Sequence, residues 1–160
     1  MVKEVLNAEN AEHLQMLKKV SHPVTEFNER LFYLLDDMRD TIIDYAGIGL
    51  AAPQIAILRR VVVLDFSSDI DGIEQDEYIE LINPEVLKSS GSQTDEEGCL
   101  SIPGERGLVT RANKVVVKFQ DRHGKWHQRE FEGLAARAVF HEIDHLNGVL
   151  YTQHVQELPN

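Results

Sequence analysis

The sequence predicts a single α+β domain over residues 1–160, with a helix early in the chain, strands in the middle and a second helix near the end. Two stretches have strong helical periodicity, and the segments between them have the alternation or the β-branched composition of strands. Strands and helices do not alternate along the chain, which argues against a parallel βαβ fold. A length of 160 residues without internal repeats is typical of one domain.

The first strong helix is expected from about Glu26 to Ala46, where apolar residues recur at spacings of three and four. Thr25 is the expected N-cap and Gly47 the expected stop. A shorter helix is expected before it, over about Ala11 to Lys19. The apolar stripe of the longer helix consists of Phe27, Leu31, Leu34, Leu35, Met38 and Ile42.

Strands are expected in the middle of the chain. Arg60 to Phe66 is an apolar run with a β-branched centre, which is typical of a buried strand. Lys114 to Gln120 alternates between apolar and polar residues, and the turn signal Asp121-Arg122-His123-Gly124 connects it to a partner strand. The other strand-like segments are Tyr78 to Ile82, Glu85 to Leu87 and Trp126 to Phe131.

The second strong helix is expected from about Gly133 to Asn147, and Gly148 closes it. Its inward face would carry Leu134, Ala138 and His141. Because that face is apolar for most of its length, a sheet must cover this helix.

Composition and charge exclude several classes of protein. The chain holds 16 Lys and Arg against 27 Asp and Glu, a formal net charge of −11, and so acidic a surface repels phosphate backbones. No apolar stretch approaches the ~20 residues of a membrane span, and the N-terminus lacks a signal-peptide core. The lone cysteine, Cys99, favours a reducing compartment. We therefore expect a cytoplasmic protein that binds neither nucleic acid nor membranes.

The run His141-Glu142-Ile143-Asp144-His145 predicts a metal site on the second helix. Histidines at positions i and i+4 lie on one helix face, so both imidazoles can reach one ion. Glu142, next to the first histidine, can remove a proton from a water bound to that ion. The alternative is an amphipathic helix that carries two histidines by chance.

A catalytic site of this type needs a third protein ligand and an open position, and the residue pattern leaves that ligand undecided. The long metalloprotease form would need histidine where Tyr151 stands. His154 and Glu157 are candidates after the helix. Cys99 is another, in a glycine-containing turn that can bring backbone close to a ligand. The histidines without ligand spacing are His13, His22, His123 and His127.

Three segments together resemble the polypeptide deformylase family in order and spacing, and the resemblance covers nearly the whole chain. The first is Gly47-Ile48-Gly49-Leu50-Ala51-Ala52-Pro53-Gln54, which by itself reads only as a loop between the first helix and a strand. The second is Glu97-Gly98-Cys99-Leu100-Ser101. The third is the histidine motif extended to Leu146-Asn147-Gly148.

The resemblance implies an enzyme that removes the N-formyl group from the N-terminal methionine of newly made polypeptides. It implies mostly antiparallel sheets around a central metal-binding helix, and Cys99, His141 and His145 as ligands of one divalent ion. Fe²⁺ is the expected ion, with Zn²⁺, Ni²⁺ or Co²⁺ as possible substitutes. The implied mechanism is attack by metal-bound hydroxide, with Glu142 as general base.

The resemblance also implies the residues around the substrate. The Gln54 side chain and the Leu100 backbone N–H would stabilise the oxyanion. The implied partners are N-formylmethionyl nascent peptides and, transiently, the ribosome, and the chain is expected as a monomer or homodimer. The residues expected to bind substrate are Ile48, Gly49, Gly98, Arg106, Leu134, Arg137 and Ala138.

Several positions depart from the common family pattern. Phe140 stands before His141 where many members carry glutamine, and little effect is expected there. Ala56 replaces a frequent glycine, which is tolerable if its φ is negative. Arg137 stands where many members carry an aliphatic residue. It could narrow the methionine pocket, extend to the rim and touch substrate, or face solvent or pair with an acid.

Two other functions are alternatives to deformylation. One is a different metallohydrolase, such as a small peptidase, which lacks its usual third ligand here. The other is a binding protein with a structural metal, which would predict a fourth protein ligand or the loss of Gln54, Glu142 or Cys99. All three residues are present in the sequence.

Overall fold

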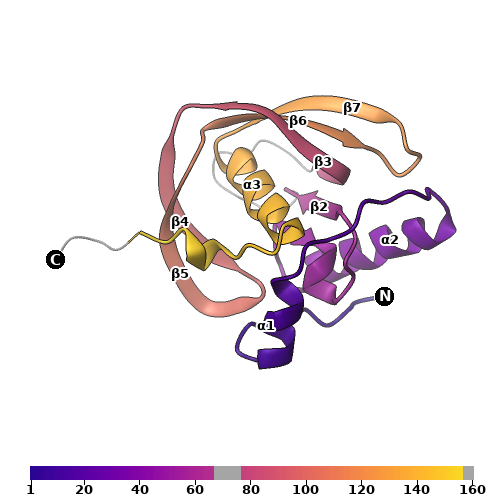
Figure 1. Cartoon of the computed structure of the whole chain (residues 1–160), viewed down its shortest axis with the longest axis horizontal. Coiled ribbons are helices and arrows are strands. Elements are labelled where there is room, and N and C mark those ends of the chain that lie inside the picture. The colour runs from indigo at the N-terminus through magenta and orange to yellow at the C-terminus, as the bar shows by residue number, and fades with distance from the viewer. Residues whose placement is uncertain (67–76, 157–160) are drawn as a thin grey trace.

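Two antiparallel sheets enclose one central helix in the computed structural model, which describes residues 1–66 and 77–156 (Figure 1). The five-stranded sheet has the order β1-β2-β3-β6-β7, and the two-stranded sheet pairs β4 with β5. The α+β prediction is therefore confirmed. The strands are β1 (Gly49–Ala51), β2 (Val61–Asp65), β3 (Tyr78–Ser90), β4 (Gln93–Cys99), β5 (Ile102–Arg111), β6 (Lys114–Gln120) and β7 (Trp126–Glu132).

The central helix is α3 (Leu134–Leu146), and β3, β6 and β7 arch over it in Figure 1. Its buried side chains Val139 and Ile143 belong to one apolar core with Val62 and Leu64 of β2. This covering by sheet is what the apolar inward face of the helix predicts.

The opposite face of β2 packs on α2 (Glu29–Asp44). Val61 and Val63 of β2 form a second core with Leu35 and Met38 of that helix. Because successive side chains of a strand point to opposite faces, β2 is buried on both sides, which explains its uninterrupted apolar run.

Both ends of α2 differ from the expected ends, for reasons of capping. Asn28 is the N-cap in place of Thr25, and its side-chain oxygen accepts from the Leu31 N–H at 3.4 Å. At the other end Ala46 adopts the left-handed conformation, with φ +54°, and donates to the Ile43 carbonyl. The helix thus ends at Asp44 in a Schellman-type turn whose left-handed residue is Ala46, the residue before Gly47.

The other helices are α1 (Ala11–Leu17), which Asn10 caps, and two short 3₁₀ helices over Ala52–Ile55 and Tyr151–Gln153. No helix within the described ranges has the length and apolar content to cross a membrane.

The β4–β5 hairpin and β1 are the elements that the apolar pattern does not predict. In β4 only Glu97 is buried, so the strand lacks the alternating apolar side chains that mark a half-buried strand. The two strand-like segments around Asn83 form one continuous strand, β3, with bulges and a φ of +51° at Asn83.

The backbone of Ala56 does not have the negative φ under which an alanine is tolerable there. Its φ is +66°, in the left-handed region, where a side chain costs about 1–2 kcal/mol. The alanine therefore occupies a position whose backbone favours glycine.

Candidate metal centre and active site

Three potential metal ligands meet between α3 and the β4–β5 hairpin. His141 and His145 lie one turn apart on α3, and Cys99 is the last residue of β4. Their ligand atoms all lie within 4.8 Å of one another, and Cys99 Sγ is 3.3 Å from His145 Nε2. His154, the alternative third ligand, instead pairs with Asp144 at 3.2 Å. Glu157 lies outside the described residues.

Glu97 of β4 orients the first of these histidines. Its Oε1 lies 2.8 Å from His141 Nδ1, which leaves His141 Nε2 to face the ligand cluster. A carboxylate on the far nitrogen of a ligating histidine is the usual arrangement around protein-bound metals.

The electrostatics of the cluster fit a cation. Burial lowers the pKa of His145 well below its usual value, so this imidazole is neutral, as a ligand must be. Burial also lowers the pKa of His141, but the charge of Glu142 and the contacts with Cys99 and Glu97 outweigh that effect and hold it well above its usual value, so the surroundings of this ring favour a positive charge. One thiol and two imidazoles form a donor set that suits Fe²⁺, Zn²⁺ and similar ions.

Glu142 projects from α3 next to His141 and is buried, with 4% of its surface exposed. Its Oε1 has no hydrogen-bond partner among the described residues. Burial raises the pKa of Glu142 to about 7, within the range of a group that exchanges protons near neutrality. The backbone of Gly49 lies so close that a Cβ there would meet Glu142 Cδ at 2.9 Å.

The amide of Gln54 is held with its nitrogen toward the cluster. Its Oε1 accepts from the Ala51 N–H at 2.9 Å, while its Nε2 lies 3.2 Å from Ser101 Oγ and 3.6 Å from Cys99 Sγ. This side chain comes from the 3₁₀ helix after β1 and is buried.

A cavity of about 540 Å³ opens onto the cluster. It brings together segments from β1, β4, β5 and α3 that are distant in sequence. Every residue expected to act in the site lines it except His145, which is fully buried. The lining residues among them are Ile48, Gly49, Gln54, Gly98, Cys99, Leu100, Arg106, Leu134, Arg137, Ala138, His141 and Glu142.

The two arginines of the site lie in different environments. Arg106 is exposed at the cavity rim, 3.4 Å from Glu96. Arg137 is buried, with its guanidinium 2.6 Å from Glu97. Arg137 therefore pairs with an acid, which is one of the possibilities that the sequence leaves open for it.

Comparisons with known proteins decide the family. The profile of the family described as polypeptide deformylase matches residues 2–160. This chain belongs to the polypeptide deformylase family. A peptide deformylase of Lachnoclostridium phytofermentans is 51% identical over 140 residues, which cover 88% of this chain and 83% of that protein.

Solved structures of deformylases share the fold. A peptide deformylase from Legionella pneumophila is 41% identical, with a TM-score of 0.88, covering 98% of this chain and 87% of that one. A class I type b peptide deformylase from Acinetobacter baumannii, bound to Met-Ala-Ser, is 34% identical, with a TM-score of 0.89 over 97% of this chain and 99% of that one. The prediction of an enzyme of this family is thus confirmed.

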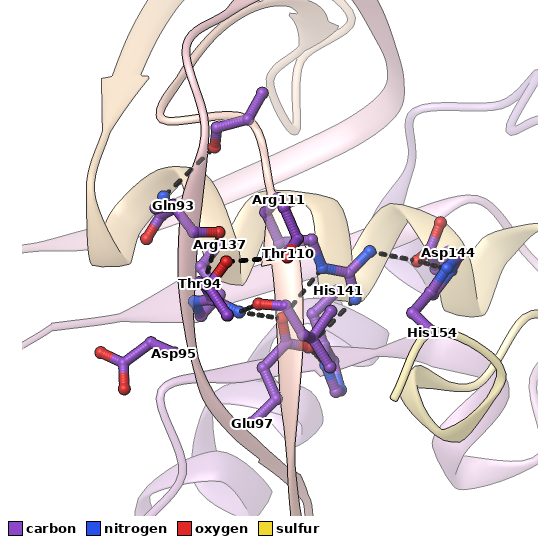
Figure 2. Close-up of polar contacts among 12 residues, drawn as sticks. Gln93, Thr94, Asp95, Glu97, Thr110, Arg111, Arg137, His141, Asp144 and His154 are labelled. Atoms are coloured by element: carbon purple, nitrogen blue, oxygen red, sulfur yellow. Dashed lines mark hydrogen bonds and ion pairs between the residues drawn. The ribbon is translucent and has the colours of Figure 1, made fainter. Parts of the chain in front are cut away.

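Sequence reasoning missed the roles of three residues that support the ligand cluster. Glu97 belongs to the Cys99 motif and has no predicted role of its own, although an acid two residues before a candidate ligand is a signal. Arg111 and Asp144 carry no such signal in the sequence. Arg111 contacts Glu97 through two nitrogens at 2.9 and 3.0 Å and Asp144 at 2.7 Å (Figure 2).

Proposed function

We propose that residues 1–160 form one catalytic domain that hydrolyses the N-formyl group from the N-terminal methionine of newly made polypeptides and releases formate. One observation carries the proposal: Cys99, His141 and His145 converge beside a buried carboxylate, Glu142, at the wall of a cavity. The Met-Ala-Ser ligand of the Acinetobacter relative supports a peptide that begins with methionine.

The three converging residues would hold one divalent ion. Such an ion acts as a Lewis acid toward the formyl carbonyl and toward water. We expect Fe²⁺ in the cell, with Zn²⁺, Ni²⁺ or Co²⁺ as substitutes, since a thiolate and two imidazoles accept all four.

Glu142 is the proposed general base. Its carboxylate takes the proton from the attacking water as the oxygen adds to the formyl carbon, and later delivers a proton to the departing amine. Its burial and its unpartnered Oε1 support this role, because neither a cation nor a hydrogen bond within the described residues competes for that oxygen.

The Gln54 Nε2–H and the Leu100 N–H are the proposed donors to the oxyanion of the tetrahedral intermediate. The bond from the Ala51 N–H fixes the amide of Gln54, so little reorganisation is needed when charge develops. Ile48, Gly49, Gly98, Arg106, Leu134 and Ala138 are proposed to contact the substrate, since all of them line the cavity. Arg137 also lines the cavity, but its guanidinium pairs with Glu97.

The test is a formate-release assay on formyl-Met-Ala-Ser, with protein purified without oxygen and metal analysis of the same sample. Oxygen is excluded because a thiolate and Fe²⁺ are both oxidisable. We expect formate from this peptide and no cleavage of its internal bonds. Metal-loaded protein that releases no formate would refute the proposal, and cleavage of internal bonds would favour a peptidase.

The variant Glu142→Ala tests the base separately. It should retain the metal, because the three ligands are unchanged, and lose turnover by at least about 100-fold. Turnover at the wild-type rate would remove Glu142 from its role. We further propose a cytoplasmic enzyme that acts as a monomer or homodimer and meets its substrates at the ribosome only transiently.

A further inference from the structure

Arg137 is an arginine buried at the wall of the cavity, one helical turn before His141 on α3. Only 4% of it is exposed. One nitrogen donates both to Glu97 Oε2 at 2.6 Å and to the Val109 carbonyl at 2.9 Å. The other terminal nitrogen lies 3.4 Å from the Gln93 carbonyl. All three acceptors belong to the β4–β5 hairpin, so Arg137 joins that hairpin to α3.

The carboxylate that Arg137 contacts has every acceptor position in use. Oε1 of Glu97 faces His141 Nδ1 and one nitrogen of Arg111. Oε2 faces a second nitrogen of Arg111 and Arg137. Since a carboxylate has about four lone-pair sites, these contacts fix both its position and its rotation (Figure 2).

The hairpin and the helix supply different members of the ligand cluster. Cys99 ends β4, whereas His141 and His145 lie on α3. The geometry of the cluster therefore depends on how the hairpin sits against the helix. Ion pairs hold that junction at two places, through the buried Arg137–Glu97 pair before His141 and through the partly buried Arg111–Asp144 pair after it.

We propose that Arg137 is a positioning residue for the metal centre, which it serves by locking Glu97 against His141 and the Cys99 hairpin against α3. The proposal rests on the metal centre proposed above. Without Arg137, Oε2 of Glu97 keeps only its contact with Arg111, and the carboxylate can pivot away from His141. The preset arrangement of the three ligands is then lost, while the ligands themselves remain.

The test compares Arg137→Met, which keeps an aliphatic stem along the cavity wall, with Arg137→Lys, which keeps the charge. Zn²⁺ affinity is measured by chelator competition, and the absorption spectrum of Co²⁺-loaded protein reports on ligand geometry. We expect R137M to weaken Zn²⁺ binding about 10-fold, to shift the Co²⁺ spectrum, and to lower kcat with KM little changed. R137K should recover part of each loss.

A double-mutant cycle with Glu97→Gln identifies the route of the effect. If Arg137 acts through Glu97, then R137M in the E97Q background changes Zn²⁺ affinity by less than about twofold. An equal loss in both backgrounds overturns the proposal. A change in KM alone, with affinity and spectrum unchanged, also overturns it, because Arg137 would then act on substrate.

The matched control is Arg129→Met, which removes an arginine from an exposed pair with Glu77. It should change neither affinity nor spectrum. Urea unfolding of each metal-free variant separates an effect on stability from an effect on ligand positioning. If R137M or E97Q does not fold, the test rests on R137K. A Co²⁺ spectrum of R137K that is not shifted, together with wild-type Zn²⁺ affinity, then refutes the proposal. Absence of formate release by wild-type protein would refute the proposed function but leave the affinity cycle readable.

Discussion

Replacing Gly49 with alanine should disable Glu142 without touching a metal ligand. The added Cβ would lie 2.9 Å from Cδ and 3.0 Å from Cγ of Glu142, closer still to Oε2, whereas ordinary contact begins near 3.4 Å. Glu142 is buried and cannot swing into solvent, so its carboxylate must shift by about 0.5 Å or more. Because a displacement of about 1 Å can cost 100-fold in rate, we expect kcat to fall by about that factor.

The assay measures kcat and KM for formate release from formyl-Met-Ala-Ser, with the metal content of each sample. Metal content should stay at the wild-type level, because the substituted residue contacts Glu142 and none of the three ligands. Crowding in the core should also lower the free energy of unfolding by about 1–3 kcal/mol.

The matched control is Gly124→Ala, at the β6–β7 turn. Its φ of +84° strains an alanine, and the three atoms nearest to the added Cβ would all belong to Phe27. This variant should lose stability and keep its kcat. If Gly49→Ala retained a kcat within about twofold of wild type, the assignment of Glu142 as a closely held base would be refuted.

Three further predictions follow from single residues. Ala56→Gly should raise the free energy of unfolding by about 0.5–1 kcal/mol, because relief of the left-handed strain exceeds the entropy cost of glycine; urea unfolding measures it, and a loss of stability would contradict it. Asn83→Ala should lower that free energy by about 3 kcal/mol, since the amide makes bonds of 2.8 and 2.9 Å to the Val24 backbone and 2.8 Å to Gln120; Asn83→Gly, which suits the backbone, should lose less. Cys99→Ser should weaken Zn²⁺ binding by at least about 10-fold in chelator competition, because a soft ligand is lost; unchanged affinity would remove Cys99 from the ligand set.

The histidine pair could be predicted from the sequence because its geometry is local. A helix brings positions i and i+4 to one face whatever surrounds it, so His141 and His145 had to lie together once the apolar stripe indicated a helix. The strands β2 and β6 could also be predicted from local patterns, because their apolar residues reflect burial by α2 and α3.

The third ligand could not be derived in that way. Cys99 lies on a hairpin whose β4 strand is mostly exposed and acidic, so no apolar pattern marks the strand or its register. Its distance to His145 is set by packing between segments far apart in the chain. Only the family motif pointed to it, and the structure then brings the thiol to 3.3 Å from the imidazole.

Backbone conformation was also beyond local reasoning. Ala46, Ala56 and Asn83 all have positive φ values, yet alanine gives no signal for that region. At Asn83 the side chain compensates with three hydrogen bonds, which depend on the positions of Val24 and Gln120 in the folded chain.

Two buried glutamates beside the same histidine illustrate how the fold divides chemical roles. Glu97 faces two arginines and His141, and although burial opposes it, the hydrogen bonds from His141 and Arg111 hold its pKa well below the usual value. Glu142 accepts no hydrogen bond from an arginine of the described residues, and burial raises its pKa to about 7. A carboxylate saturated by donors can orient a ligand but cannot accept another proton, whereas an unpartnered one can. The partners of each glutamate, rather than its place in a motif, therefore favour Glu142 over Glu97 as the proposed base.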